Sequence, residues 1–273
     1  MSRILFLGDS HSQGYYVESV GQFTFPYFWQ KNNYAEIYAE ANNTPAVIYA
    51  AAGTVNSRYV DWVKVCLDRY SDIEKIVIQS LQWNRFLLAS SMQKEHNELP
   101  VDFFSISVTT DGSVHRYTDR VGLEESINFS DILYYQHPAG SDYNSLKTIL
   151  AAGNHYRPNL QKDDFIQVKI WAELMTHLQH QEYCKTMYII DRLCQERNIE
   201  IYLWRMNDKI HLPEDYELYG TLSNTKMFRT SAEEYLQSIG YDLQNYLTID
   251  QEHYNEDAHK LIANYFLPKV FEK

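Results

Sequence analysis

Short apolar runs alternate along the chain with longer segments of helical periodicity. Two of these longer segments, 25–40 and 57–70, carry apolar residues three and four positions apart, as do helices that cover a sheet. The runs are rich in Ile, Val, Leu and Tyr, which is typical of buried parallel strands; they are 4–8, 46–50, 75–80 and 199–204. This alternation predicts an open α/β fold with right-handed crossovers.

The C-terminal part of the chain continues the pattern. Residues 164–198 are helical in character over most of their length, and 246–249 reads as a last strand. The closing segment 255–271 is predicted to be a helix, with Asn255 as its N-cap. Two acidic residues follow Asn255 in the first turn, where the helix dipole favours negative charge.

One stretch interrupts the alternation and contains a hairpin signal. In FFSISVTTDGSVHRY, alternating apolar residues lead to an Asp-Gly dipeptide at 111–112 and then to a second short run. A two-residue turn at this dipeptide would pair Val108 with His115 and Ile106 with Tyr117.

The hairpin lies in a region, about 89–163, that shows no βα unit. We interpret this region as an insertion that rises above the sheet and not as a second domain, so that residues 1–273 form one domain. Because it leaves the chain just after the third strand, it is expected to form a cap over the ligand crevice or a wall of it.

Charge and composition restrict the partners of the protein. The formal net charge of −12 argues against binding to nucleic acid or to anionic membrane surfaces. No apolar run is long enough to span a membrane, and the first run is too short for a signal peptide. Cys66, Cys184 and Cys194 form no CxxC pair and are odd in number, which is typical of reduced thiols. A cytoplasmic location is therefore expected.

The first apolar run ends in GDSHS, residues 8–12. A serine just beyond the carboxyl end of a strand projects into the crevice where α/β proteins bind ligands, but it needs a base to become a nucleophile. Near the C-terminus, Asp250 and His253 are three residues apart, so that a turn can bring the carboxylate to the imidazole. The alternative is that Asp9 and Ser10 only cap a helix. His259 is better interpreted as a helix-surface or packing residue than as the base.

These blocks resemble the SGNH (GDSL-type) hydrolases, a family of flavodoxin-like esterases, acetylesterases and lipases. The resemblance implies that Ser10 is the nucleophile, with His253 as base and Asp250 as its acid partner. It also implies an oxyanion hole formed by Ser10, by Gly53 after the second strand and by Asn84 after the third. The fold it implies is a three-layer α/β sandwich of about five parallel strands in the order 2-1-3-4-5, with a large insertion after the third strand.

The chain departs from the family pattern in two blocks. The third block is usually Gly-x-Asn-Asp, and here Gln82 and Arg85 replace the glycine and the final aspartate. This weakens the match at Asn84. Arg85 could bind an acidic group of the substrate or lie in a surface ion pair. His11, after the serine, is also unusual for the family and is either a substrate contact or a loop side chain.

The expected activity is hydrolysis of an ester without metal or cofactor. Family habit implies a short acyl group, such as an O-acetyl group on a carbohydrate. The expected partner is thus a small-molecule or glycan ester, and a homo-oligomer is left open.

Two other functions compete with this one. A metal-dependent phosphoesterase could use Asp9 and His11, although further ligand blocks of that class are missing. A weaker metal candidate is Glu173 with His177 and His180 on one helix face, although an exposed polar face explains this pattern more simply. The other alternative is a non-catalytic module of the same fold that binds carbohydrate or protein.

Overall fold

A computed structural model of the chain describes most of the α/β scaffold. The described residues are 2–20, 23–29, 32–50, 56–81, 85–90, 102–108, 114–118, 123–124, 134–135, 142–144, 162–208, 210, 212–213, 222–248 and 253–272. For residue 13, strands β2, β3 and β6–β11, and residues 162–177 and 179 of α5, this description covers the backbone only.

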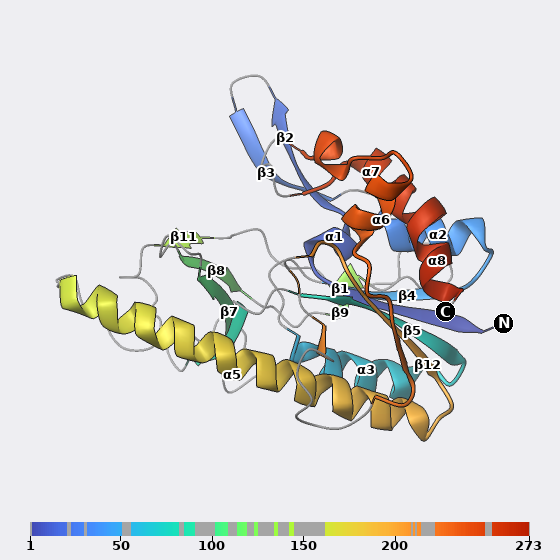
Figure 1. The fold of residues 1–273 in the computed structure, drawn as a ribbon, viewed down its shortest axis with the longest axis horizontal. Coiled ribbons are helices and arrows are strands. Elements are labelled where there is room, and N and C mark those ends of the chain that lie inside the picture. The colour runs from blue at the N-terminus through green and yellow to red at the C-terminus, as the bar shows by residue number, and fades with distance from the viewer. Residues whose placement is uncertain are drawn as a thin grey trace.

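Five parallel strands form the central sheet (Figure 1). They are β1 (Arg3–Gly8), β4 (Ala46–Ala50), β5 (Ile73–Ser80), β12 (Glu200–Arg205) and β13 (Thr225–Met227). The spatial order β13-β12-β5-β1-β4 is the predicted order 2-1-3-4-5, so the flavodoxin-like fold class is confirmed. Strand β1 lies between β4 and β5, which makes the first apolar run an inner strand with a neighbour on each side.

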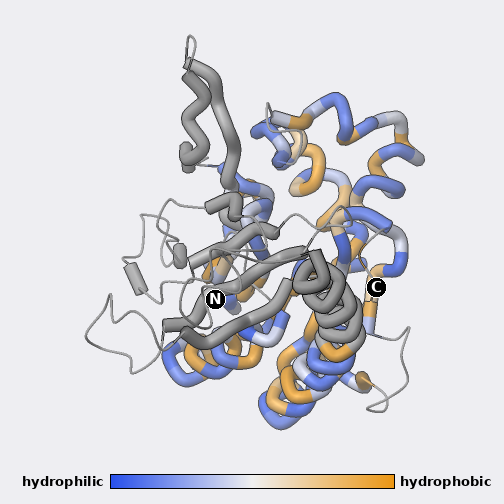
Figure 2. Tube along the Cα trace, turned by 90° about the vertical axis from the view of Figure 1, so that its left-hand side faces the viewer, coloured by the Kyte–Doolittle hydropathy of each residue, from blue (hydrophilic) through white to orange (hydrophobic). Residues whose placement is uncertain are grey.

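Helices cover both faces of this sheet (Figure 1). One face packs against α3 (Arg58–Arg69) and α5 (Lys162–Gln195). The other face packs against the remaining larger helices, which are α2 (Tyr34–Ala41), α6 (Ala232–Ser238), α7 (Glu256–Leu261) and α8 (Leu267–Phe271). Figure 2 shows apolar and polar residues alternating around the turns of the helices, as two-faced packing requires. None of the helices in the described part of the chain has the length and apolar character needed to cross a membrane.

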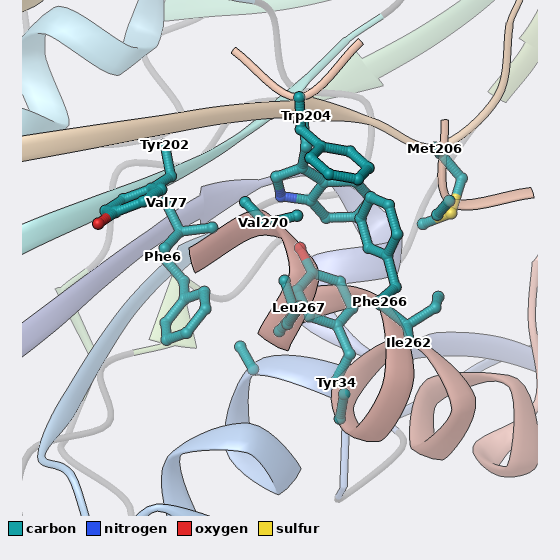
Figure 3. Close-up of a cluster of buried hydrophobic side chains, with 14 of the residues drawn as sticks. Phe6, Tyr34, Val77, Tyr202, Trp204, Met206, Ile262, Phe266, Leu267 and Val270 are labelled. Atoms are coloured by element: carbon teal, nitrogen blue, oxygen red, sulfur yellow. The ribbon is translucent and has the colours of Figure 1, made fainter. Parts of the chain in front are cut away.

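Alternate residues of β1 serve the two cores that lie on either side of the sheet. Ile4 and Phe6 join the core under α2 and the C-terminal helices, while Leu5 and Leu7 join the core under α3 and α5. A strand that is buried on both faces must be apolar at every position, which is why the run reads as continuous. Figure 3 shows the first core, in which aromatic rings fill the space between sheet and helices.

A cluster of aromatic rings dominates that core. The ring centroid of Trp204, at the end of β12, lies 5.2 Å from that of Phe266 and 5.4 Å from that of Tyr34, both in edge-to-face arrangements (Figure 3). Such edge-to-face pairs add to the stabilisation from burial. Phe266 belongs to a π-helical turn, Ile262–Phe266, that joins α7 to α8. Pro268 follows it and cannot donate to the preceding turn, which accounts for the local widening.

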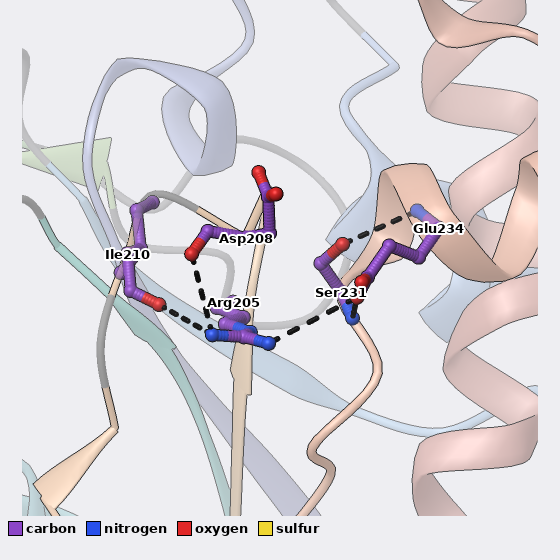
Figure 4. Close-up of polar contacts among 5 residues, drawn as sticks. All are labelled: Arg205, Asp208, Ile210, Ser231 and Glu234. Carbon is purple, nitrogen blue, oxygen red and sulfur yellow. Dashed lines mark hydrogen bonds and ion pairs between the residues drawn. The ribbon is translucent and has the colours of Figure 1, made fainter. Parts of the chain in front are cut away.

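The end of β12 is tied to α6 by a polar cluster (Figure 4). The guanidinium of Arg205 donates to the carbonyl oxygens of Asp208 (3.4 Å) and Ile210 (3.0 Å) and lies 3.9 Å from the carboxylate of Glu234. Ser231 and Glu234 form a capping box, in which each side chain bonds the other's backbone N–H. These contacts hold the start of α6 at the carboxyl edge of the sheet.

Smaller strands outside the central sheet form three antiparallel groups. β2 (Tyr15–Val20) pairs with β3 (Phe23–Trp29), and β9 (Leu123–Glu124) pairs with β10 (Tyr134–Tyr135). The largest group has the order β11-β8-β7-β6, with bounds Asp142–Asn144, Val114–Thr118, Asp102–Val108 and Arg85–Ser90. The described residues also include the short helix α1 (Ser10–Gln13) and a 3-10 helix at Leu243–Tyr246.

The hairpin predicted around residues 111–112 is present, but its predicted register is wrong by one residue. Val108 pairs with Val114 and Ile106 with Arg116 in the β7–β8 ladder. A two-residue turn at 111–112 would pair Val108 with His115 and is therefore not compatible with this register. Residues 109–113, between the two strands, lie outside the described residues. The antiparallel sheet also begins earlier than predicted, because β6 already starts at Arg85.

Two further predictions are corrected. The helix predicted for 25–40 begins only at Tyr34, where Asn33 caps it, and residues 25–29 belong to β3. The aromatic residues there mimic helical spacing but pair as a strand. The last strand is not 246–249 but Thr225–Met227. The helix predicted for 57–70 and that for 255–271 are confirmed apart from small shifts at their ends and the π-helical turn.

Candidate active site

The turn that carries Ser10 follows directly on β1. Asp9 caps the short helix α1, and its carboxylate accepts a hydrogen bond from the backbone N–H of His11 at 3.1 Å. Gly14 ends this helix in the left-handed conformation, with a φ of 74°, which favours glycine. The capping role foreseen for Asp9 is therefore confirmed. Ser10 is the first residue of α1 and is buried just beyond the carboxyl end of β1.

The Ser10 hydroxyl contacts the imidazole of His253. Its Oγ lies 2.9 Å from Nε2 of His253, across 243 positions of sequence. In the tautomer that carries the proton on Nδ1, the hydroxyl donates to Nε2, which is the arrangement a general base requires. The structure thus brings together the serine and the histidine that the sequence singled out.

The segment around His253 is closed by backbone hydrogen bonds. The carbonyl oxygen of His253 accepts from the N–H of Thr248 at 2.7 Å, and Leu247 and Tyr254 form an isolated antiparallel bridge. Asn255 then caps α7 by accepting from the N–H of Ala258, as its position in the sequence predicts. Backbone contacts therefore hold the two ends of this segment together, and His253 lies at its C-terminal end.

The His11 ring packs between the rings of His253 and Tyr254. The ring centroid of His11 lies 5.3 Å from that of His253 and 5.1 Å from that of Tyr254. The Tyr254 hydroxyl donates to Glu233 of α6. Burial, followed by the neighbouring Glu233 carboxylate, raises the pKa of Tyr254, so it remains a neutral donor. His11 is thus a partly buried packing neighbour of His253, and its part in substrate binding stays a prediction.

His259 is buried and does not contact Ser10 in the manner of a base. Its Nδ1 accepts a hydrogen bond from the backbone N–H of Tyr34 at 3.3 Å. Burial, together with nearby His11 and His253, lowers its pKa to about 3. The packing role foreseen for His259 is confirmed, whereas a position on the helix surface is excluded by its complete burial.

A buried polar network lies directly beneath the turn. The side-chain amide of Gln79, on β5, donates to the Asp9 carboxylate at 3.1 Å and accepts from the Ser12 hydroxyl at 2.6 Å. The Tyr34 hydroxyl contacts both Ser12 and Gln79. The sequence did not single out Gln79 and Tyr34 as part of the site. The available signal was a glutamine directly after the apolar residues 76–78 of β5.

Several residues of the expected site lie outside the described residues. These are Asp250, Gly53 and Asn84, together with Gln82. Arg85 begins β6, but its side chain is not described. The roles of these residues stay predictions.

One described contact joins the ends of the two segments that hold Gly53 and Asn84. The side chain of Asn56 accepts from the N–H of Leu81 at 3.2 Å and donates to its carbonyl oxygen at 3.4 Å. Asn56 directly follows residues 51–55, the segment that holds Gly53. Leu81 directly precedes residues 82–84, the segment that holds Asn84. Both segments therefore have an end at the same edge of the sheet, near the end of β5.

The described residues that were candidate metal ligands make other contacts in the structure. Oδ1 of Asp9 already accepts two hydrogen bonds, from His11 and Gln79. Among the described residues, no group of three or more His, Cys, Asp or Glu side chains is placed to hold a metal ion. His180 is buried beside Cys184, with its ring nitrogens 3.8 and 3.9 Å from the sulfur, so the exposed face foreseen for it is wrong. The side chains of Glu173 and His177 lie outside the described part.

Comparisons with known proteins identify no family for this chain. No family model matches the sequence, and no curated protein matches it significantly. The solved structures that resemble it include a carbohydrate esterase whose active site is described as having divergent catalytic and non-catalytic binding functions (TM-score 0.44, 13% identity). Others are the esterase EstA of Pseudoalteromonas sp. (0.42, 10%) and the acetyl xylan esterase Est2A of the rumen bacterium Butyrivibrio proteoclasticus (0.45, 10%).

The alignments cover 100%, 100% and 99% of this chain. They cover 65% of the carbohydrate esterase, 98% of EstA and 64% of Est2A, so the chain spans less than two thirds of two of these proteins. At such TM-scores and identities, the likeness carries no argument about the activity of this chain.

Proposed function

We propose that this protein is a serine-dependent ester hydrolase of the SGNH type, with Ser10 as nucleophile and His253 as general base. The observation that supports the proposal is the 2.9 Å contact between Oγ of Ser10 and Nε2 of His253. The contact lies beyond the carboxyl end of β1, an inner strand of the parallel sheet, where α/β folds bind their ligands. Such a pair is the core of an activated nucleophile.

The reaction proceeds in two steps. Oγ of Ser10 attacks the ester carbonyl carbon while its proton passes to Nε2 of His253, and the proton then leaves with the alcohol. Water, deprotonated by His253, attacks the acyl-serine, which releases the acid and restores the Ser10 hydroxyl. Asp250, three residues before His253, is proposed to accept from Nδ1–H and so to stabilise the imidazolium.

Negative charge develops on the carbonyl oxygen in both steps. The backbone N–H of Ser10 is a donor at the start of α1, and Gly53 and Asn84 are proposed as the other two donors. Each such donor is worth about 3 kcal/mol of activation free energy in serine hydrolases. The substrate is proposed to be a short-chain ester, such as an O-acetyl group on a carbohydrate.

The test is hydrolysis of p-nitrophenyl acetate by the wild type and by Ser10→Ala, with and without a chelator. Hydrolysis that is lost in Ser10→Ala and unaffected by the chelator supports the proposal. Hydrolysis that survives in Ser10→Ala contradicts catalysis by Ser10. Loss of activity on chelation would favour the metal-dependent alternative, and absence of Ser10-dependent hydrolysis would favour the non-catalytic one.

A further inference from the structure

The side-chain amide of Gln79 bridges the two sides of the Ser10 turn. Its Nε2 donates to the carboxylate of Asp9, the residue before Ser10, at 3.1 Å. Its Oε1 accepts from the hydroxyl of Ser12, two residues after Ser10, at 2.6 Å, and from that of Tyr34 at 3.2 Å. All four of these side chains are at least 95% buried.

The chemistry of these partners leaves the amide one orientation. A carboxylate only accepts hydrogen bonds, so the Asp9 side chain must face the Nε2 donor and the two hydroxyls must face Oε1. Rotating the amide by 180° would place its oxygen against the carboxylate. Burying a primary amide without hydrogen bonds costs free energy, and these contacts offset that cost.

The space around the amide is filled on the side of β1. A Cβ on Gly8 would lie 1.6 Å from the Ser12 hydroxyl oxygen and 2.9 Å from Oε1 of Gln79. The absence of a side chain at Gly8 therefore lets Ser12 and Gln79 meet against the end of β1. The turn is held to β5 by side chains on either side of the nucleophile.

We propose that Gln79 is a positioning residue, whose buried amide holds Asp9 and Ser12 and thereby aims the Ser10 hydroxyl at His253 and the Ser10 N–H at the substrate carbonyl. The inference rests on the proposed function of Ser10. Gln79 does not touch the reacting atoms and acts through the turn. Its contribution comes from orientation, since a displacement of about 1 Å can cost on the order of 100-fold in rate.

The first test compares Gln79→Met with Ser80→Ala. Methionine has a similar length to glutamine but offers no N–H donor and only a weak acceptor. Ser80 is the next residue of the same strand, is equally buried, and bonds instead to Tyr183 of α5 at 2.8 Å. We expect Gln79→Met to lower kcat for p-nitrophenyl acetate by about 10- to 100-fold, with KM close to the wild-type value. Ser80→Ala should keep the wild-type kcat while losing a comparable amount of stability.

The second test uses Gln79→Glu. While it is protonated, the introduced carboxyl group reproduces the amide, with its O–H donating to Asp9 and its C=O accepting from Ser12. Once ionised, the same group opposes the Asp9 carboxylate, because two carboxyls in contact share one proton. The kcat ratio of this variant to the wild type should therefore fall as the pH rises, while that of Gln79→Met stays constant. Among the described residues, the titratable groups that bond Gln79 are Asp9 and Tyr34 at the side chain and Tyr59 at the backbone carbonyl oxygen. Dividing by the wild-type kcat at each pH corrects for the pH dependence that these groups have in both proteins.

Tyr34→Phe provides a further test in case the Gln79 variants do not fold. It removes one hydroxyl from Oε1 and leaves Gln79 in place, and it should lower kcat in the same direction by a smaller factor. The inference is contradicted if folded Gln79→Met has the wild-type kcat, or if Gln79→Met and Ser80→Ala lose kcat equally. It is also contradicted if the kcat ratio of Gln79→Glu to the wild type does not change with pH. These outcomes leave the proposed function of Ser10 intact. If the wild type shows no Ser10-dependent hydrolysis, the proposed function fails and the inference fails with it.

Discussion

Nδ1 of His259 accepts a hydrogen bond from the backbone N–H of Tyr34 at 3.3 Å, and the two rings stack with centroids 5.9 Å apart. His259 lies on α7, the helix that follows the His253 segment, and Tyr34 is the first residue of α2. The Tyr34 hydroxyl in turn contacts Ser12 and Gln79 under the Ser10 turn. Buried polar contacts therefore connect the element after His253 with the turn that carries Ser10.

Replacing His259 should change the pH dependence of stability. Its pKa is lowered from 6.5 to about 3, so between these values the unfolded chain binds a proton that the folded chain does not. The free energy of unfolding is then unaffected above pH 6.5 and falls as the pH drops below it. One such group contributes a slope of at most ~1.4 kcal/mol per pH unit.

His259→Asn keeps an acceptor for the Tyr34 N–H and removes the titration. Urea denaturation between about pH 4.5 and about pH 8 should show a shallower loss of stability in this variant than in the wild type. Parallel pH profiles of the two proteins would mean that His259 is not buried as a neutral ring.

Ser10 and His253 should behave as one catalytic unit. We expect Ser10→Ala and His253→Ala each to lower kcat for an activated ester by about 10⁴-fold or more, because each removes the same activated nucleophile. The double variant should be no slower than Ser10→Ala. Steady-state kinetics provide the measurement, on variants shown to have the same thermal unfolding temperature as the wild type. If the loss of kcat in the double variant is the product of the two single losses, the two residues act independently.

Gly8→Ala should be far more harmful than Gly240→Ala. The new Cβ at position 8 would lie 2.5 Å from Cβ of Ser12 and still closer to its hydroxyl oxygen, so Ser12 must move. We expect a loss of stability of about 1–3 kcal/mol, as for other overpacked sites, together with a fall in esterase activity.

Gly240 is the matched control for this substitution. It has a φ of +95° and nothing within 4 Å of an added Cβ, so only its backbone strain of about 1–2 kcal/mol should appear. Thermal unfolding and kcat of both variants provide the measurement. Unchanged activity in a folded Gly8→Ala would contradict the close approach of Ser12 to β1.

The three cysteines should be unreactive in the folded protein. These three described residues form no disulfide and are buried, and burial raises the pKa of Cys66 and of Cys194 to about 12. Because the thiolate is the reactive form, iodoacetamide at about pH 8 should modify them much more slowly in buffer than in urea. Mass spectrometry counts the modified thiols, and rapid native labelling of Cys66 or Cys194 would contradict their environment.

The β7–β8 hairpin is expected to serve substrate recognition. Deleting residues 103–118 should lower activity on an acetylated polysaccharide far more than on p-nitrophenyl acetate, because the insertion is predicted to wall the crevice. The comparison of the two rates, in a variant shown to fold, is the measurement. Equal losses on both substrates would assign the hairpin to stability.

The local pattern of apolar and polar residues was sufficient to predict most of the strands of the central sheet. The strands β1, β4, β5 and β12 each contain a run of apolar residues that is buried on both faces, and such runs are visible without knowledge of their neighbours. The same holds for the helix cap at Asn255, whose partner is only three residues away. The order of the strands followed from the family resemblance and is confirmed.

Edge and pairing details required the tertiary structure. β13 is a three-residue edge strand of half-buried residues, so it has no apolar run to reveal it. A residue of another element holds it in place: Asp191 of α5 accepts hydrogen bonds from the N–H of Asn224 and the hydroxyl of Thr225. The register of β7 on β8 depends on the length of the connection between them, which the Asp-Gly dipeptide does not determine.

The candidate site divides in the same way. Ser10 and His253 were recognisable because each stands in a short motif whose residue types suggest its chemistry. Gln79 was not, since a glutamine in a strand acquires its meaning only from Asp9 and Ser12, 70 and 67 positions away. Sequence periodicity records which stretches are buried as a whole, whereas a single buried hydrogen bond depends on where distant strands end in space, and only the folded chain decides that.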